Sequence, residues 1–247
     1  PEALAWERPA GVTAVAAAAV PVNYLTAWQM LRVMAPPGEG ETVLVHSAAG
    51  GVGQAAIQLA KMAGARVLGT ASRAKHEGLR AAGVEAVFDS RDEQFSSAVL
   101  EATGGVGADV VLEPRNGKWI MESYRSLAKC GRLVLFGFSS AAVGSGSGTL
   151  SALRTLARVP WLRINPISLM NDNKSMAGVN LGRMWDQQQR TGRWMESILG
   201  LVADRTLTPV IDAVLPFEEA AEAHRRLEER RNVGKVVLVP DPEEETA

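Results

Sequence analysis

Short apolar segments alternate with amphipathic ones along much of this 247-residue chain. The apolar segments are almost continuous in hydrophobic residues, as expected of strands that are buried on both faces. The intervening segments carry apolar residues at helical spacing. Strands joined by helices of this length predict an α/β fold with a doubly wound parallel sheet. The predicted strands are 42–46, 66–71, 84–88, 108–112 and 131–136, and the predicted helices are 51–63, 75–82, 93–103 and 118–127.

The remainder of the chain follows a looser pattern. A helix interrupted by Pro21 is predicted for 15–33, ahead of the alternation. After Gly137, a loop rich in Ser and Gly at 139–148 leads into an amphipathic segment, 150–163. The later elements are predicted as a sixth strand at 175–181, helices at 195–203 and 218–231, and strands at 210–215 and 235–239.

Composition and charge exclude several classes of protein. The net charge is −1, so no overall field attracts nucleic acid or an anionic membrane. The longest early apolar run, 14–22, is far shorter than the roughly 20 residues that a membrane-spanning helix needs. Cys130 is the sole cysteine in the sequence, so an intramolecular disulfide is impossible, as suits a cytoplasmic protein. We expect its thiol to be buried and structural.

The turn between the first predicted strand and helix, 47–53, reads Ser-Ala-Ala-Gly-Gly-Val-Gly. Aligned on the pattern G-x-G-x-x-G, it places small residues at Ala48, Gly50 and Gly53, with Ala48 departing from the usual glycine. In dinucleotide-binding Rossmann domains these positions make a tight turn, admit the pyrophosphate and let the helix pack on the sheet. The amides that begin the helix then face the anion. An ordinary glycine-rich turn is the alternative, which the flanking strands and helix disfavour.

The end of the second predicted strand indicates which dinucleotide binds. NAD-binding domains carry Asp or Glu there, about 20 residues after the glycines, to bond the ribose 2′-OH. Here 69–75 reads Gly-Thr-Ala-Ser-Arg-Ala-Lys, without an acid. Ser72, Arg73 and Lys75 instead offer a hydroxyl and two cations to a 2′-phosphate, which predicts NADP(H). The alternative is that Arg73 and Lys75 only solvate the start of a helix.

These residues resemble the zinc-independent quinone-oxidoreductase branch of the medium-chain dehydrogenase/reductase superfamily. The segment VLVHSAAGGVGQAAIQLAK looks like its cofactor fingerprint, VNYLTAW at 22–28 like the preceding helix, and NVGKVVLVP at 232–240 like the closing strand. Within that branch, 69–84 and the C-terminal end are most similar to the vesicle amine transport protein (synaptic vesicle membrane protein) subgroup. The resemblance covers essentially the whole chain.

The resemblance implies a fold, a chemistry and an assembly. It implies a six-stranded Rossmann domain that binds NADPH and a metal-free reduction of quinones or of activated alkenes and carbonyl compounds. It also implies a homodimer formed through 175–181. The cofactor contacts of the family carry over onto Asn23, Thr26, Ala49, Gly50, Gly51, Val52, Gly53, Ser72, Lys75, Phe136, Gly137 and Asn232, to which the residues themselves add Arg73.

The chain departs from the family in three places. Ser90, with Arg91 beside it, stands where a Tyr usually contacts the cofactor, and the bulky, charged stretch 113–117 stands where a Gly-Gly turn is common. The barrel-like catalytic domain that begins full-length members is also missing. We therefore expect a connector at 1–14, the NADP(H)-binding Rossmann domain at 15–205, a segment that returns to the absent domain at 206–240, and a disordered acidic tail at 241–247.

Other candidate chemistry is weaker. His46, His76 and His224 lie away from Cys, Asp or Glu at metal-ligand spacing, so no metal site is predicted. His46 is interpreted as a packed or capping residue. Tyr24 and Tyr124 are interpreted as core residues rather than proton donors. The catalytic residues stay unknown, because hydride transfer needs a positioned cofactor and acceptor rather than a protein nucleophile.

Two functional interpretations remain open. In the first, the parent protein is an NADPH-dependent oxidoreductase, and this chain is mainly its cofactor-binding domain and is inactive alone. In the second, it is a weakly active or non-catalytic NADPH-binding scaffold that meets lipid membranes or protein partners. Arg154, Arg158 and Arg163 give 150–163 a basic face suited to peripheral membrane contact, although a covering or dimer-packing helix is the alternative.

Overall fold

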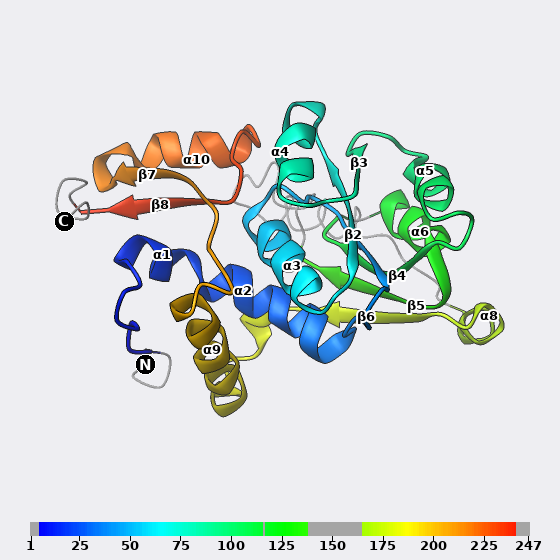
Figure 1. Ribbon diagram of the computed structural model, residues 1–247, viewed down its shortest axis with the longest axis horizontal. Coiled ribbons are helices and arrows are strands. Elements are labelled where there is room, and N and C mark those ends of the chain that lie inside the picture. Colours follow the sequence, from blue (N-terminus) through cyan, green and yellow to red (C-terminus); the bar gives the residue numbers. More distant parts are fainter. Residues whose placement is uncertain (1–4, 116, 138–164, 241–247) are drawn as a thin grey trace, which may run out of the picture. The chain divides into compact units, whose positions relative to one another are not determined.

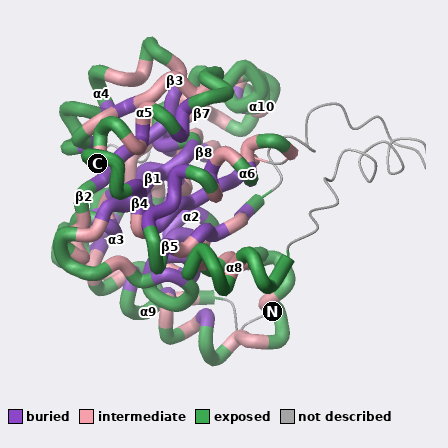
Figure 2. The backbone as a smooth tube through the Cα atoms, turned by 90° about the vertical axis from the view of Figure 1, so that its right-hand side faces the viewer, coloured by how far each residue is buried: buried purple, intermediate pink, exposed green. Residues whose placement is uncertain are grey.

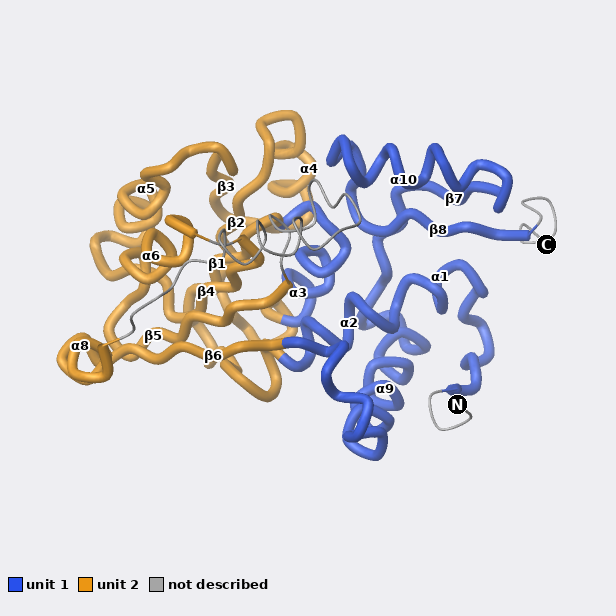
Figure 3. The backbone as a smooth tube through the Cα atoms, turned by 180° about the vertical axis from the view of Figure 1, so that it is seen from behind, with its two compact units in different colours: residues 1–29, 48–59, 180–247 blue, residues 30–47, 60–179 orange. Residues whose placement is uncertain are grey.

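The computed structural model describes residues 5–115, 117–137 and 165–240. The predicted loop at 139–148, the amphipathic segment at 150–163 and the acidic tail at 241–247 lie outside the described residues. The chain divides into two compact units (Figure 3). Unit 1 comprises residues 1–29, 48–59 and 180–247, and unit 2 comprises residues 30–47 and 60–179.

A six-stranded parallel sheet forms the centre of unit 2 (Figure 1). Its strand order is β3-β2-β1-β4-β5-β6, the order of doubly wound dinucleotide-binding sheets. Val43 in β1 pairs with Val67 on one side and with Val110 on the other. The predicted Rossmann-type α/β fold is therefore confirmed. The strands are β1 (Thr42–Val45), β2 (Arg66–Ala71), β3 (Ala86–Asp89), β4 (Ala108–Glu113), β5 (Leu127–Phe136) and β6 (Ser175–Val179).

The core of unit 2 lies between this sheet and its helices. Leu44, Leu68, Val111 and Leu133 come from four strands and are buried with Phe95 in one cluster. In Figure 2 the central strands β1 and β4 are coloured as buried, in line with their nearly continuous apolar sequence. The helices of unit 2 are most of the π-helix Gln29–Met34, the 3-10 helix Arg73–Lys75, α4 (His76–Ala81), α5 (Phe95–Ala102), α6 (Lys118–Arg125) and α8 (Pro166–Asp172).

The start of β5 differs from the sequence-based prediction. The strand begins at Leu127 rather than at residue 131, and the preceding helix ends at Arg125. Gly107 has φ +95°, and a Cβ added there would lie 2.7 Å from the backbone nitrogen of Ala128. Glycine at position 107 permits this close approach, and Leu127 pairs with Ala108 in the sheet.

Cys130 was expected to be buried, and that prediction is wrong. The thiol is exposed, and the residue has φ +64° within the irregular first half of β5. The sequence Lys129-Cys130-Gly131 adjoins a buried apolar run, which suggested burial, but Lys129 and Cys130 are both exposed in the first half of β5.

Two helices were missed or shortened by the sequence reading. In α8, the Asn165 side chain accepts a hydrogen bond from the Ile167 amide and Pro166 stands in the first turn. This Asn-Pro start was a readable helix signal. The helix α9 (Gln188–Ala203) begins at Gln188 rather than at residue 195. The prediction missed its first two turns because they are mostly polar and lack apolar periodicity.

Unit 1 contains the start of the chain and its C-terminal part. A parallel pair of strands, β7 and β8, is joined by α10. Ala19 at the end of α1 is buried with Val237 and Val239 of β8. Its elements are α1 (Ala14–Ala19), α2 (Pro21–Trp28), most of α3 (Gly51–Met62), the 3-10 helix Leu181–Arg183, α9 (Gln188–Ala203), β7 (Ile211–Pro216), the 3-10 helix Phe217–Glu219, α10 (Ala220–Glu228) and β8 (Lys235–Val239). The break before Pro21 is confirmed.

The edge of the large sheet bears on the predicted assembly. The strand β6 pairs only with β5 in that sheet, so its other side lies at the sheet edge among the described residues. Pairing of two copies through β6, which the resemblance implies, stays a prediction. Across the described ranges, no helix is both long and apolar enough to cross a membrane.

Candidate functional site

The predicted phosphate-binding turn follows β1 directly and leads into α3. The backbone turns at Ser47, which has φ +52°, whereas Ala48 is absent from the residues with positive φ. Left-handed conformations cost little for glycine and more for most other residues. Because this turn places the left-handed residue at Ser47, Ala48 can occupy the first small position and is fully buried there.

The glycines after the turn lie against two segments that are distant in sequence, all within unit 1. The Gly234 amide donates a hydrogen bond to the Ala49 carbonyl at 2.8 Å, and Gly50 forms an isolated parallel bridge with Gly234. A Cβ added at Gly51 would collide with the side-chain amide of Asn23. The closing segment and α2 therefore both meet the start of α3.

The start of α3 has the features of an anion site. The first intrahelical bond runs from the Gln54 amide to the Gly50 carbonyl at 2.8 Å, so the amides of Gly51, Val52 and Gly53 precede it. Such first-turn amides lack partners within their helix and carry the positive end of its dipole. The Gln54 side chain donates to the Ala48 carbonyl at 3.1 Å and braces the turn.

The other predicted cofactor contacts in unit 1, Thr26 and Asn232, have different hydrogen-bond partners. Thr26 donates its hydroxyl to the Val22 carbonyl of its own helix at 2.7 Å. Asn232 donates its side-chain amide to the Gly234 carbonyl at 2.9 Å. Asn232 thus supports the conformation of the residue that contacts the turn, while Thr26 is satisfied locally. Their contact with a cofactor stays a prediction.

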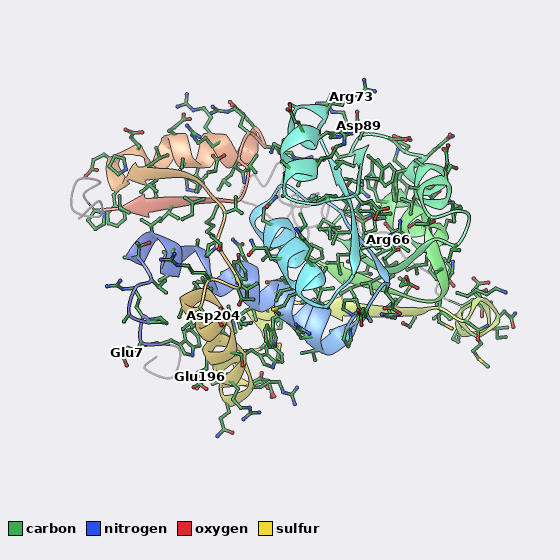
Figure 4. All side chains as sticks on the ribbon, viewed as in Figure 1. Glu7, Arg66, Arg73, Asp89, Glu196 and Asp204 are labelled. Carbon is green, nitrogen blue, oxygen red and sulfur yellow. The ribbon has the colours of Figure 1, made fainter. Side chains whose placement is uncertain are left out.

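The second group of predicted residues lies in unit 2, at the carboxyl edge of the sheet. Ser72 directly follows β2 and precedes the 3-10 helix that contains Arg73 and Lys75. The Arg73 Nε donates to Asp89 Oδ2 at 3.0 Å, and the two residues stand together at the top of Figure 4. Phe136 and Gly137 stand at the end of β5, on the same edge because all six strands are parallel. The pairing of Arg73 with Asp89 was not predicted from the sequence.

A buried ion pair occupies the end of β4. Glu113 is 1% exposed, and both of its carboxylate oxygens accept hydrogen bonds from the Arg115 guanidinium, at 2.9 and 3.0 Å. The guanidinium also stacks 4.2 Å from the centre of the Trp119 ring. Bidentate pairing and stacking are the geometry that arginine favours in buried sites. The charged stretch that departs from the family pattern therefore neutralises its own charge.

His46 joins this pair to the end of β1, and its tautomer follows from its neighbours. Arg115 Nη2 approaches His46 Nδ1 at 2.9 Å, and a guanidinium can only donate, so Nδ1 accepts. Nε2 then carries the proton and donates to Ser123 Oγ at 3.0 Å. The Ser123 hydroxyl in turn donates to Glu113 Oε2. His46 is thus a packed, hydrogen-bonded residue, as predicted, in a cluster of His46, Thr70, Glu113, Arg115 and Ser123 that we call the buried polar cluster.

Burial sets the protonation states in the buried polar cluster. The pKa of His46 is lowered to about 3, mainly because burial disfavours the charged imidazole and further because Arg115 repels it; Glu113 opposes this shift. Burial alone would raise the pKa of Glu113, but the hydrogen bond and positive charge of Arg115 and the hydrogen bond from Ser123 outweigh it and hold that pKa below its usual range. A neutral imidazole beside a carboxylate–guanidinium pair is therefore the stable arrangement at neutral pH.

Acid should destabilise the fold through His46. An unfolded histidine titrates near pH 6.5, whereas the folded one titrates at about 3. The unfolded state therefore binds more protons between these values, and stability that is present above pH 6.5 is lost as the pH falls. We expect urea denaturation at pH 7.5, 6.0 and 5.0 to show a loss that approaches about 1.4 kcal/mol per pH unit. His46→Asn should reduce this slope, and the exposed control His224→Asn should not; equal slopes in all three proteins would contradict the assignment.

Comparison with known proteins places the chain in a family. The family model described as zinc-binding dehydrogenase matches residues 82–238. The chain belongs to the zinc-binding dehydrogenase family. The predicted membership of the medium-chain dehydrogenase/reductase superfamily and the similarity to the vesicle amine transport subgroup are likewise confirmed.

Relatives of this dehydrogenase-family chain are longer than the chain itself. The synaptic vesicle membrane protein VAT-1 homolog of Rattus norvegicus is 34% identical over 249 residues, which cover 100% of this chain and 60% of the relative. A mycobacterial protein solved in complex with NADPH is 30% identical with a TM-score of 0.80, covering 97% of this chain and 70% of that one. The CurK enoyl reductase is 31% identical with a TM-score of 0.75, covering 94% and 64%. The chain thus spans about 60% of the curated relative's length.

The remaining candidates in this dehydrogenase-family chain concern metal binding and tyrosines. Within the part of the chain that the structure describes, no three or more His, Cys, Asp or Glu side chains gather where they could hold a metal ion. Tyr24 is buried, as predicted for a core residue, and burial raises its pKa to about 12. Tyr124 is partly buried against the core and donates its hydroxyl to Asp172 at 2.9 Å. Neither tyrosine is assigned a chemical role.

Proposed function

We propose that this chain is the NADP(H)-binding part of an oxidoreductase that transfers hydride to a quinone or to an activated alkene or carbonyl compound. The observation that carries the proposal is the glycine-rich turn after β1, at the centre of a sheet with the order β3-β2-β1-β4-β5-β6. Doubly wound sheets of this order bind dinucleotides at that turn. The similarity to a mycobacterial protein in complex with NADPH supports the same cofactor here.

Each part of the cofactor has a candidate binding segment. The amides of Gly51, Val52 and Gly53 would hold the pyrophosphate, because they begin a helix whose first residue, Gly51, has no room for a side chain beside Asn23. Ser72, Arg73 and Lys75 would hold the 2′-phosphate, because they follow β2 where an NAD-binding domain carries an acid. Phe136 and Gly137, at the end of β5, would line the nicotinamide end.

The bound nicotinamide would supply the hydride, and the chain's own residues would bind and orient it. An electron-poor alkene or quinone is the acceptor class that we propose, supported by similarity to an enoyl reductase. Part of the acceptor site would come from segments that the longer relatives have and this chain lacks. For this reason we expect NADPH binding from the 247-residue chain and little turnover.

Cofactor choice provides the test. We expect NADPH to raise the melting temperature of the chain and to bind more tightly than NADH in a calorimetric titration. Arg73→Ala combined with Lys75→Ala should weaken NADPH binding by about 1–3 kcal/mol, the range for lost charge-assisted hydrogen bonds, and should spare NADH. Arg80→Ala, an exposed cation on α4, is the control and should change neither titration.

Several outcomes would contradict the proposal. If neither cofactor changes the melting temperature, the chain does not bind a dinucleotide. If the double variant weakens the binding of both cofactors equally, Arg73 and Lys75 do not recognise the 2′-phosphate. If NADPH binds but none of a panel of quinones and enones supports its oxidation by the full-length protein, the protein is an NADPH-binding scaffold and not a reductase.

A further inference from the structure

Asp89 lies beside the segment proposed to read the 2′-phosphate. It is the last residue of β3 and stands in register with Ala71, the last residue of β2. The Ser90 amide donates to the Ala71 carbonyl at 2.9 Å, which fixes the two strand ends together. An acid therefore stands at this edge of the sheet after all, on the third strand rather than on the second.

The two oxygens of the Asp89 carboxylate have different partners. Oδ1 accepts a hydrogen bond from the Arg91 backbone amide at 3.0 Å, which anchors the carboxylate to its own loop. Oδ2 accepts from Arg73 Nε at 3.0 Å. The Arg91 amide and Arg73 together lower the pKa of Asp89 below its ordinary value, so the group is ionised at neutral pH. The anchored carboxylate can therefore fix the direction of a side chain that would otherwise be free.

The geometry of the pair leaves Arg73 able to bind an anion. The bond to Asp89 uses Nε, whereas the terminal nitrogens carry most of the N–H donors of a guanidinium. The Arg73 side chain is 86% exposed, so a ligand phosphate can reach it. An exposed ion pair of this kind contributes little to folding stability. Its effect should appear in binding, because a long side chain that is already held loses less conformational freedom when it grips a ligand.

We propose that Asp89 is a positioning residue that holds Arg73 for the 2′-phosphate and thereby sets the preference for the phosphorylated cofactor. The inference rests on the proposed function. Arg73 offsets the negative charge of Asp89, so Asp89 would repel a 2′-phosphate once Arg73 is removed. The effect of losing Asp89 should therefore depend on whether Arg73 is present.

A double-mutant cycle on the 247-residue chain tests this dependence. NADPH and NADH are titrated against the wild type, Asp89→Ala, Arg73→Ala and the double variant. We expect Asp89→Ala alone to weaken NADPH binding about threefold to tenfold, leaving NADH binding and the melting temperature of the unliganded chain unchanged. In the Arg73→Ala background, the same substitution should leave NADPH binding unchanged or strengthen it. A role independent of Arg73 would instead give the same loss in both backgrounds.

The chain offers a matched control pair on the same two strands. Arg66 and Glu85 form an exposed ion pair at the amino end of β2 and just before β3. Glu85→Ala removes a carboxylate from an equivalent arginine at the opposite edge of the sheet, so it should change neither cofactor's affinity. Asp89→Asn retains an acceptor oxygen and should recover part of the NADPH affinity that Asp89→Ala loses.

The outcomes separate this inference from the function on which it rests. Wild-type protein that fails to bind NADPH would overturn both. Wild-type protein that binds NADPH in preference to NADH, with Asp89→Ala equal to or tighter than wild type, would overturn the inference alone. Equal effects of Asp89→Ala with and without Arg73 would also overturn it, because Asp89 would then act independently of Arg73.

Discussion

Replacing Glu113 with alanine is expected to lower the free energy of unfolding by about 3–5 kcal/mol, the cost of breaking a buried ion pair from one side. Arg115 would lose both carboxylate contacts while its side chain remains only 12% exposed. The Ser123 hydroxyl, which accepts a hydrogen bond from His46 and donates one to Glu113, would lose its acceptor. Urea denaturation followed by circular dichroism at pH 7.5 measures the loss.

An exposed ion pair provides the comparison. Glu85 pairs with Arg66 at the surface, where both side chains are about half exposed. Removing Glu85 should cost about 0–1 kcal/mol, because water replaces the lost partner. A cost for Glu113→Ala as small as that for Glu85→Ala would show that water reaches the buried polar cluster and that its charges are not desolvated.

The second large effect is expected at Gly234, outside the large sheet. Gly234 has φ +84°, and an added Cβ would collide with the carbonyl oxygen of Val210. Alanine there combines steric overlap with a disfavoured backbone conformation, so we expect a loss of about 3 kcal/mol or more. NADPH affinity should fall as well, because the Gly234 amide bonds to Ala49 next to the proposed pyrophosphate site. Thermal unfolding and cofactor titration measure the two effects.

The control for this variant is another glycine of the same unit. Gly200 lies within α9, and nothing stands within 4 Å of a Cβ added there. Alanine at Gly200 should raise stability by about 0.5–1 kcal/mol, because it favours the helix, and should leave cofactor binding unchanged. If Gly234→Ala retained wild-type stability and affinity, the close approach of the closing segment to the turn would have no energetic importance.

The sheet could be predicted from the sequence because its strands are buried on both faces. Val43, Leu44 and Val45 are all fully buried, so the apolar runs stand out against the helices between them. The phosphate-binding turn was likewise predictable, since its residues are contiguous and their order carries the signal. The predicted element boundaries were wrong where the backbone conformation depends on a contact with a residue distant in the sequence. The start of β5 is an example, since Leu127 passes close to Gly107.

The side-chain pairs could not be predicted, because their members are far apart in the chain. Arg115 and His46 are separated by 69 residues, and Arg73 and Asp89 by 16. Each of these residues was visible in the sequence as a charged or titratable group near a strand end. Which one pairs with which depends on strand order and register, which a single sequence does not contain. The charged stretch at the end of β4 therefore could not be interpreted from the sequence alone, because its partners lie elsewhere in the chain.

The left-handed residue at Ser47 has a consequence for how such proteins are recognised. A search pattern that demands glycine at the first position of the fingerprint assigns the conformational requirement to residue 48, where this backbone has none. Relatives that shift the bend one residue earlier would accept alanine there and escape such a pattern. Genome surveys for dinucleotide-binding proteins should therefore allow any small residue at that position and rely on the two later glycines.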